Sequence, residues 1–164
     1  MKNLYLIRHA KSDWNDESKS DFERGLNKRG EKAIVTMGNV LKEKRVMPDL
    51  ILCSSAKRTT LTARGLAKEI GYDGEIKYID ALYMAEPGTI YKQIKDISNI
   101  VDTLFVVGHN PETTEFSNMM TNEYIDNVPT LGIVALKLPI DNWGKFKMGE
   151  GKMQFFIYPK MFKQ

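Results

Sequence analysis

The sequence predicts an α/β fold with three layers, α/β/α, in which helices cover both faces of a mostly parallel central sheet. Two observations carry this prediction. Short apolar runs typical of buried strands recur along the chain, and segments with helical spacing of apolar residues separate them. Strands that alternate with helices connect through right-handed crossovers and therefore pair mostly in parallel.

Five apolar runs are expected to be strands. Each is short and bounded by turn-forming or polar residues, which is the pattern of a strand buried in a sheet. The runs at residues 4–7, 50–53 and 104–107 are the strongest, and those at 133–138 and 155–158 are weaker.

Three segments between these runs have the apolar spacing of helices. The first follows Asn27, a candidate N-cap, and extends to Leu41. The second ends before Gly71, a residue suited to the left-handed conformation just past a helix end. The third centres on residues 90–97.

A fourth helix is expected after the strand at residues 104–107. Pro111 has the fixed φ and missing N–H that suit a first helical position, so Asn110 becomes the expected N-cap. Residues 124–129 and 141–151 are predicted to be surface loops, because turn-forming residues dominate them.

Length and composition indicate one compact domain over residues 1–164, with 42% hydrophobic and 27% charged residues. The 24 basic and 21 acidic residues are spread along the chain, which gives no support for a nucleic-acid partner. No apolar stretch approaches a membrane span or a signal peptide, so we expect no membrane partner and a cytoplasmic location. The single cysteine, Cys53, cannot form an internal disulfide.

Polar residues of one chemical kind follow the three strongest predicted strands. The first strand runs into Arg8 and His9, the second is followed by Arg58 in the first turn of a helix, and the third leads to His109. In an open α/β sheet the ligand crevice lies beyond the carboxyl ends of the strands. We therefore expect these four side chains to share one site.

The site is predicted to bind a phosphoryl group. A cation in the first turn of a helix interacts unfavourably with the helix macrodipole. A bound anion would offset this unfavourable interaction at Arg58. Helix N-termini attract phosphate, and two guanidinium groups bind its oxygens in bidentate fashion. Because neighbouring arginines disfavour its cationic form, a histidine there stays neutral and its ring nitrogen is available to attack phosphorus.

The two histidines have two other possible roles. Either histidine taken alone fits a hydrogen-bonded structural residue, but their matched positions at strand ends favour a shared function. A metal site would need more ligands than two histidines provide, and Cys53 lies in a buried run. We therefore expect neither a metal nor a cofactor.

Three motifs resemble those of the histidine phosphatase superfamily, which also contains the phosphoglycerate mutases. The stretch "RHAKSDWN" is similar to the family's Arg-His-Gly-x-Ser-x-x-Asn, with Ala10 in place of glycine. "SSAKRTTLTA" resembles its second-arginine motif and "VVGHNP" its second-histidine motif. The alanine and the chain length resemble the small SixA-like phosphohistidine phosphatase branch, which implies a phosphoglycerate mutase-like fold.

The resemblance also implies a role for each matching residue. His9 would be the nucleophile and form a phosphohistidine intermediate. Three residues would bind the phosphoryl group: Arg8, Arg58 and His109. Three more would line the pocket: Ser12, Asn15 and Asn110.

The proton donor to the leaving group is left open between two interpretations. Glu86 lies where mutase-like members carry an acidic donor, and it equally fits a loop carboxylate beside Pro87 and Gly88. If the leaving group is imidazole, Glu86 is dispensable. Arg24 is a further candidate to reach the pocket, and Trp14 is predicted to anchor its loop.

These inferences predict a metal-independent hydrolase that passes a phosphoryl group through His9 to water. A phosphohistidine on a protein is the favoured substrate, because few residues remain after the core elements to enclose a small metabolite. The alternatives are a phosphatase or mutase of small phosphorylated metabolites and a non-catalytic phospholigand-binding protein.

Overall fold

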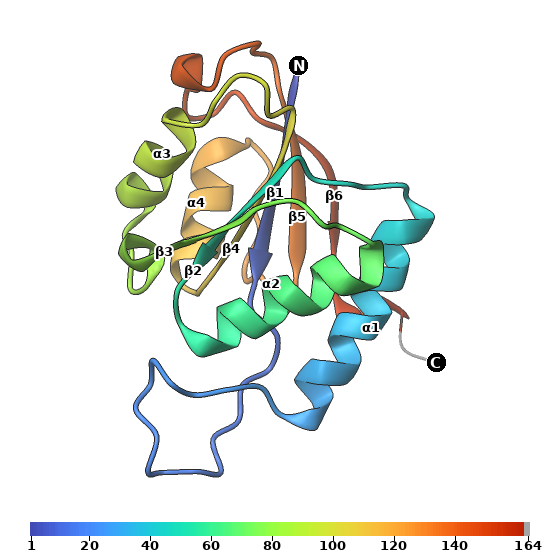
Figure 1. Cartoon of the computed structure of the whole chain (residues 1–164). Coiled ribbons are helices and arrows are strands. Elements are labelled where there is room, and N and C mark those ends of the chain that lie inside the picture. The colour runs from blue at the N-terminus through green and yellow to red at the C-terminus, as the bar shows by residue number, and fades with distance from the viewer. Residues whose placement is uncertain (163–164) are drawn as a thin grey trace.

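The computed structural model describes residues 1–162, which form three layers: a central sheet with helices on both of its faces (Figure 1). The strands are β1 (Lys2–Arg8), β2 (Leu50–Ser54), β3 (Ile76–Ile79), β4 (Thr103–Gly108), β5 (Ile133–Leu138) and β6 (Lys152–Ile157). Their order in the sheet is β3-β2-β4-β1-β5-β6, and β5 runs antiparallel to both of its neighbours. The predicted α/β fold with a mostly parallel sheet is confirmed.

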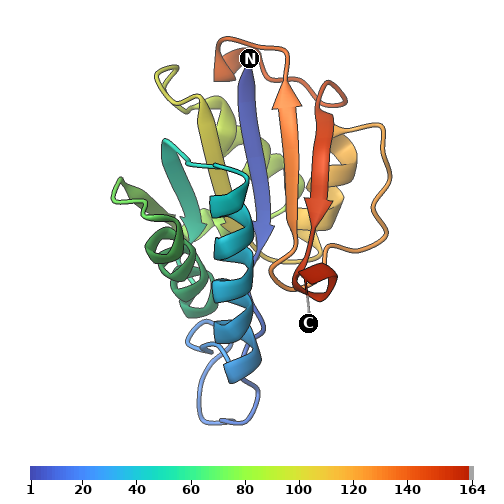
Figure 2. The same cartoon turned by 90° about the vertical axis from the view of Figure 1, so that its right-hand side faces the viewer.

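Two helices cover each face of the sheet. They are α1 (Lys28–Glu43), α2 (Lys57–Ile70), α3 (Pro87–Lys95) and α4 (Glu112–Met120). Helices α1 and α2 lie on one face, and α3 and α4 lie on the other (Figure 2). No helix among residues 1–162 is long and apolar enough to cross a membrane.

The central strands contribute side chains alternately to two separate cores. In β1, Leu4 and Leu6 pack toward α3 and α4, whereas Ile7 packs toward α1 and α2. Successive side chains of a strand point to opposite faces, so a strand covered on both sides needs apolar residues at nearly every position. This requirement explains why the central strands appear in the sequence as continuous apolar runs.

The predicted helix boundaries agree with the structure at two caps. The side chain of Asn27 accepts a hydrogen bond from the N–H of Gly30 at 2.8 Å, and Gly71 ends α2 with φ of 77°. The start of α4 differs by one residue, because Pro111 lies at the cap position and the helix begins at Glu112. The Asn110 side chain still accepts a hydrogen bond from Thr114 N at 3.2 Å.

Two expectations about the less regular parts of the chain were wrong. Strand β3 was not predicted, because it lies at the sheet edge and two of its four residues are exposed. The segment 141–151 is more than a surface loop, since Trp143 and Phe146 are fully buried within it. The Trp143 ring N–H also donates to the carbonyl of Val101 at 2.8 Å.

The sheet order brings three strand ends together. Strands β2, β4 and β1 are consecutive neighbours and run in the same direction, so their carboxyl ends meet at one edge. There the N–H of His9 donates to the carbonyl of Gly108 at 3.0 Å, and the carbonyl of His9 accepts from Leu131 N at 3.0 Å. The backbone of the predicted nucleophile is therefore bonded on both sides.

We predict that Gly38→Ala destabilises the fold, because α1 and α2 lie too close together at this position for an added methyl group. A Cβ on Gly38 would lie 2.4 Å from the Cβ of Glu69, so the two helices would have to separate. Overpacking of this kind lowers the free energy of unfolding by about 1–3 kcal/mol. Urea denaturation measures the effect. Gly88→Ala is the matched control, because a Cβ there meets nothing within 4 Å; equal stability of the two variants would contradict the prediction.

Candidate functional site

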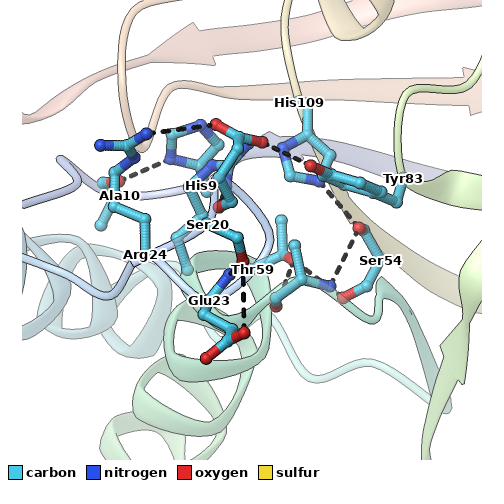
Figure 3. A network of polar contacts seen from close by, with 12 residues as sticks. His9, Ala10, Ser20, Glu23, Arg24, Ser54, Thr59, Tyr83 and His109 are labelled. Carbon is cyan, nitrogen blue, oxygen red and sulfur yellow. Dashed lines mark hydrogen bonds and ion pairs between the residues drawn. The ribbon is translucent and has the colours of Figure 1, made fainter. Parts of the chain in front are cut away.

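The structure brings the two histidines of the chain together. The ring centroids of His9 and His109 lie 5.4 Å apart with their planes inclined at 56° (Figure 3). Both residues are nearly inaccessible to solvent, with exposed fractions of 8% and 6%. They come from the neighbouring strand ends of β1 and β4, where the sequence placed them.

The backbone determines the tautomer of His9. Its Nδ1 lies 2.6 Å from the carbonyl oxygen of Ala10, and a carbonyl can only accept, so Nδ1 carries the ring proton. Nε2 therefore keeps its lone pair. The N–H of Ala10, in the peptide that joins it to His9, donates to Thr62 Oγ1 of α2 at 3.0 Å. The neutral ring presents a nucleophilic nitrogen.

Burial is the main reason that His9 is neutral. The pKa of His9 is lowered to about 4, mainly by burial; the hydrogen bond to Ala10 opposes this shift, and the nearby cations Arg58 and Arg8 add to it. From the sequence, the neutral state is predicted as an effect of the arginines alone. The direction was right, but removal of the ring from water is the larger cause.

His109 is held by a serine at the end of β2. Its Nε2 lies 2.7 Å from Ser54 Oγ, and the same Oγ accepts a hydrogen bond from Ala56 N at 3.4 Å. The hydroxyl proton can be donated to Nε2, and in that arrangement Nδ1 is the protonated nitrogen of the ring. Burial lowers the pKa of His109 to about 3, so this ring is also neutral. Sequence analysis missed Ser54, whose only signal is its place at a strand end.

Arg58 is buried in the first turn of α2, as predicted. The cap residue Ala56 makes no side-chain hydrogen bond, and the first turn holds no acidic residue. The guanidinium donates through Nη1 to the carbonyl of Asp21 at 2.7 Å and through Nη2 to Asp21 Oδ2 at 3.1 Å. Its other donors remain available for an anion at this helix N-terminus.

The Arg8 guanidinium is held by the loop that follows α4. Its Nη1 donates to the carbonyl of Val128 at 3.1 Å, and Asn110 Nδ2 donates to the same oxygen at 3.0 Å. The loop that follows α4 therefore aligns both of these predicted residues. Ile125 and Val128 of this loop are buried, so packing holds it against the domain.

Three other predicted residues have weaker links to this pocket. Ser12 is buried and forms an isolated bridge with Leu26. Asn15 is exposed, and its N–H donates to Asp13 Oδ1 at 2.9 Å. Glu86 is exposed at the cap position of α3, and its carboxylate makes no hydrogen bond or ion pair with residues 1–162. Their roles remain predictions.

Two residues that sequence analysis did not propose complete the pocket. The Tyr83 hydroxyl donates to Asp21 Oδ2 at 2.6 Å, and the Tyr83 ring lies edge-on to His109 with centroids 5.6 Å apart (Figure 3). Asp21 Oδ1 also lies 3.7 Å from Arg24 Nη2, which brings Arg24 to the site. Asp21 and Tyr83 are 62 residues apart and have no local sequence signal.

Trp14 contacts another residue of its own loop. Its side chain is 67% exposed. Its ring stacks on the Arg24 guanidinium, whose carbon lies 3.5 Å from the ring centroid, a contact compatible with the predicted anchoring of the loop. Trp14 thus holds Arg24 beside Asp21.

The arrangement is suited to a tetrahedral oxyanion. Within residues 1–162, three buried nitrogen atoms lack a hydrogen-bond partner: Arg8 Nε, Arg24 Nε and His109 Nδ1. All three belong to side chains at this site, and oxygen atoms of an anion would satisfy such donors. The same residues contain no cluster of three or more His, Cys, Asp or Glu side chains able to hold a metal ion.

Comparisons with known proteins agree with this geometry. The histidine phosphatase superfamily (branch 1) matches residues 4–91. An uncharacterised protein of Mycobacterium tuberculosis is 30% identical over 94% of this chain and 100% of its own. A structure from Agrobacterium tumefaciens, provisionally named phosphohistidine phosphatase SixA, is 28% identical with a TM-score of 0.84, covering 96% of this chain and 98% of its own.

A second structure supports the fold alone. The protein histidine phosphatase SixA complexed with tungstate has a TM-score of 0.84 at 19% identity, covering 98% of this chain and 99% of its own. The chain belongs to the histidine phosphatase superfamily and is SixA-like in structure. Family membership and the paired histidines together support phosphatase activity.

We predict that both imidazoles stay neutral from about pH 8 to about pH 5, because their pKa values lie well below 6.5. Imidazole chemical shifts measure this directly, since the chain contains only two histidines. The unfolded chain binds protons near pH 6.5 while the folded chain does not. The stability that the neutral rings contribute is therefore complete above pH 6.5 and is lost as the pH falls toward 4. Titration of either ring near pH 6.5 would contradict this account.

Proposed function

We propose that this protein is a phosphatase that forms a covalent phosphohistidine on His9 and transfers the phosphoryl group to water. The hydrogen bond between His9 Nδ1 and the carbonyl of Ala10 carries this proposal, because it leaves the Nε2 lone pair free to attack phosphorus. The attack forms an Nε2–P bond and breaks the bond between phosphorus and the leaving group.

The residues around His9 supply charge stabilisation for this step. Arg8 and Arg58 would bind the equatorial oxygens of the phosphoryl group, and His109 Nδ1–H would donate to one of them. Arg24, held by Trp14, would add a third guanidinium. A neutral imidazole and guanidinium groups suffice for this chemistry, so we also propose that the reaction needs no metal.

The substrate we favour is a phosphohistidine on a protein. The likeness to the Agrobacterium tumefaciens structure supports this choice, since that protein carries the name of a phosphohistidine phosphatase. Hydrolysis of small phosphorylated metabolites is the competing function that the same pocket chemistry permits.

Trapping of the phosphoenzyme tests the mechanism. We expect acid-labile labelled phosphate on His9 after rapid quenching of a reaction with an aryl phosphate in excess EDTA. His9→Ala removes the attacking nitrogen, so turnover should fall by about 1,000-fold or more. Circular dichroism checks that the variant is folded. Unchanged turnover in His9→Ala, or a requirement for added divalent metal, would exclude the mechanism.

A substrate panel tests the specificity. We expect kcat/KM for a phosphohistidine-containing protein to exceed that for sugar phosphates by at least about tenfold, because the substrate protein would contact the surface around the pocket. Phosphoramidate serves as a reference that has the same N–P bond without a protein. Higher kcat/KM for a sugar phosphate would favour the metabolite phosphatase instead.

A further inference from the structure

Asp21 is the one carboxylate that contacts the arginines of the pocket among residues 1–162. Its Oδ2 accepts hydrogen bonds from Tyr83 at 2.6 Å and from Arg58 at 3.1 Å, and its Oδ1 lies 3.7 Å from Arg24. The Tyr83 ring that donates to it lies against His109. Asp21 therefore bonds directly to Arg58 and to Tyr83, and Tyr83 in turn contacts His109.

Asp21 lies on a loop beyond the strand end that carries His9. It lies on the strap, residues 11–26, which extends beyond the carboxyl ends of the strands (Figure 1). His9 directly follows β1, so an attack by its ring would come from the edge of the sheet. In-line displacement requires the entering and leaving atoms to lie on opposite sides of phosphorus. The leaving atom, and later the attacking water, therefore lie on the side of the strap.

Backbone and ring contacts of Phe22, the next residue in the chain, hold Asp21 in place together with its own backbone. The N–H of Lys57 donates to the carbonyl of Phe22 at 3.0 Å, and the Phe22 ring packs edge-on against Tyr83 with centroids 5.0 Å apart. The Asp21 carbonyl itself accepts from Arg58. The carboxylate is nevertheless 46% exposed, so water reaches it.

Asp21 is in the ionised state that a general base requires. The hydrogen bond from the Tyr83 hydroxyl holds the pKa of Asp21 below its ordinary value, and Arg58 lowers it further, while burial opposes them. Asp21 is therefore ionised at neutral pH. The same hydrogen bond raises the pKa of Tyr83, which keeps the phenol protonated as the donor.

We propose that Asp21 is the general base of the hydrolytic half-reaction, an inference that rests on the proposed phosphohistidine mechanism. A water molecule forms a bond from its oxygen to phosphorus, and the bond between phosphorus and His9 Nε2 breaks with its electron pair returning to Nε2. Asp21 takes one proton from the water. The products are neutral His9, still protonated at Nδ1, orthophosphate and a protonated Asp21 that releases its proton to solvent.

Two other carboxylates are rivals for this role. Glu86 was the candidate from the sequence, and its carboxylate has no polar contact with the described residues. Glu112, in the first turn of α4, lines an apolar cavity with His109 and Leu82, and burial raises its pKa, so the ionised form that a general base requires is disfavoured there. Neither has a polar contact with the pocket arginines.

The test measures the two half-reactions separately with phosphoramidate as the phosphoryl donor. Asp21→Asn preserves shape and can still accept from Tyr83, so formation of phospho-His9 should change by less than about threefold. Hydrolysis of the trapped phosphoenzyme should slow by about 100-fold or more, the scale of general base catalysis. Asp21→Gly should show the same defect and recover hydrolysis with added formate, a rescue that a merely structural role would not produce.

Asp16→Asn is the matched control, because Asp16 lies on the same strap and its carboxylate accepts hydrogen bonds, within residues 1–162, only from Ser18. The inference is overturned if hydrolysis in Asp21→Asn is unchanged, if both half-reactions slow equally, or if formate rescues nothing. It is also overturned if Glu86→Gln or Glu112→Gln produces the hydrolysis defect instead. Absence of any phosphoenzyme in the wild-type protein would instead reject the proposed function.

Discussion

The hydrogen bond from His9 Nδ1 to the carbonyl of Ala10 is the contact on which the site depends. It is 2.6 Å long, and it assigns the proton of the ring to the nitrogen that faces the backbone. The two peptides that precede this carbonyl are held by other segments: the N–H of His9 donates to Gly108 and the N–H of Ala10 donates to Thr62. Strand pairing and the packing of α2 thus hold the backbone from which the His9 ring and the Ala10 carbonyl extend.

In this site the positive charge lies on arginines, whereas the two imidazole rings are neutral. Burial keeps His9 and His109 neutral, because a desolvated imidazole loses its proton readily, whereas guanidinium groups keep theirs. In the proposed mechanism, positive charge for anion binding would come from arginine, and the neutral rings would be left for attack and hydrogen bonding. The N-terminus of α2 adds its dipole next to Arg58 without any capping carboxylate in its first turn.

Asp21 adds the single negative charge that contacts these arginines within the described chain. It engages Arg58 through two separate oxygens, one from the backbone and one from the side chain, so it orients the fork as well as balancing its charge. The contact joins the strap to α2, and Tyr83 joins it to the segment before α3. Three segments that are distant in the chain thereby contact one carboxylate.

The sequence by itself determined the central strands, two helix caps and the four strand-end residues, because apolar periodicity and cap chemistry are encoded by near neighbours. Only the tertiary structure decided the partners of those residues. Ser54 meets His109 across 55 residues, and Asp21 meets Tyr83 across 62, and no local pattern marks either pair. Hydrogen-bond partners and the burial that lowers a histidine pKa depend on how distant segments pack, which a linear pattern does not encode.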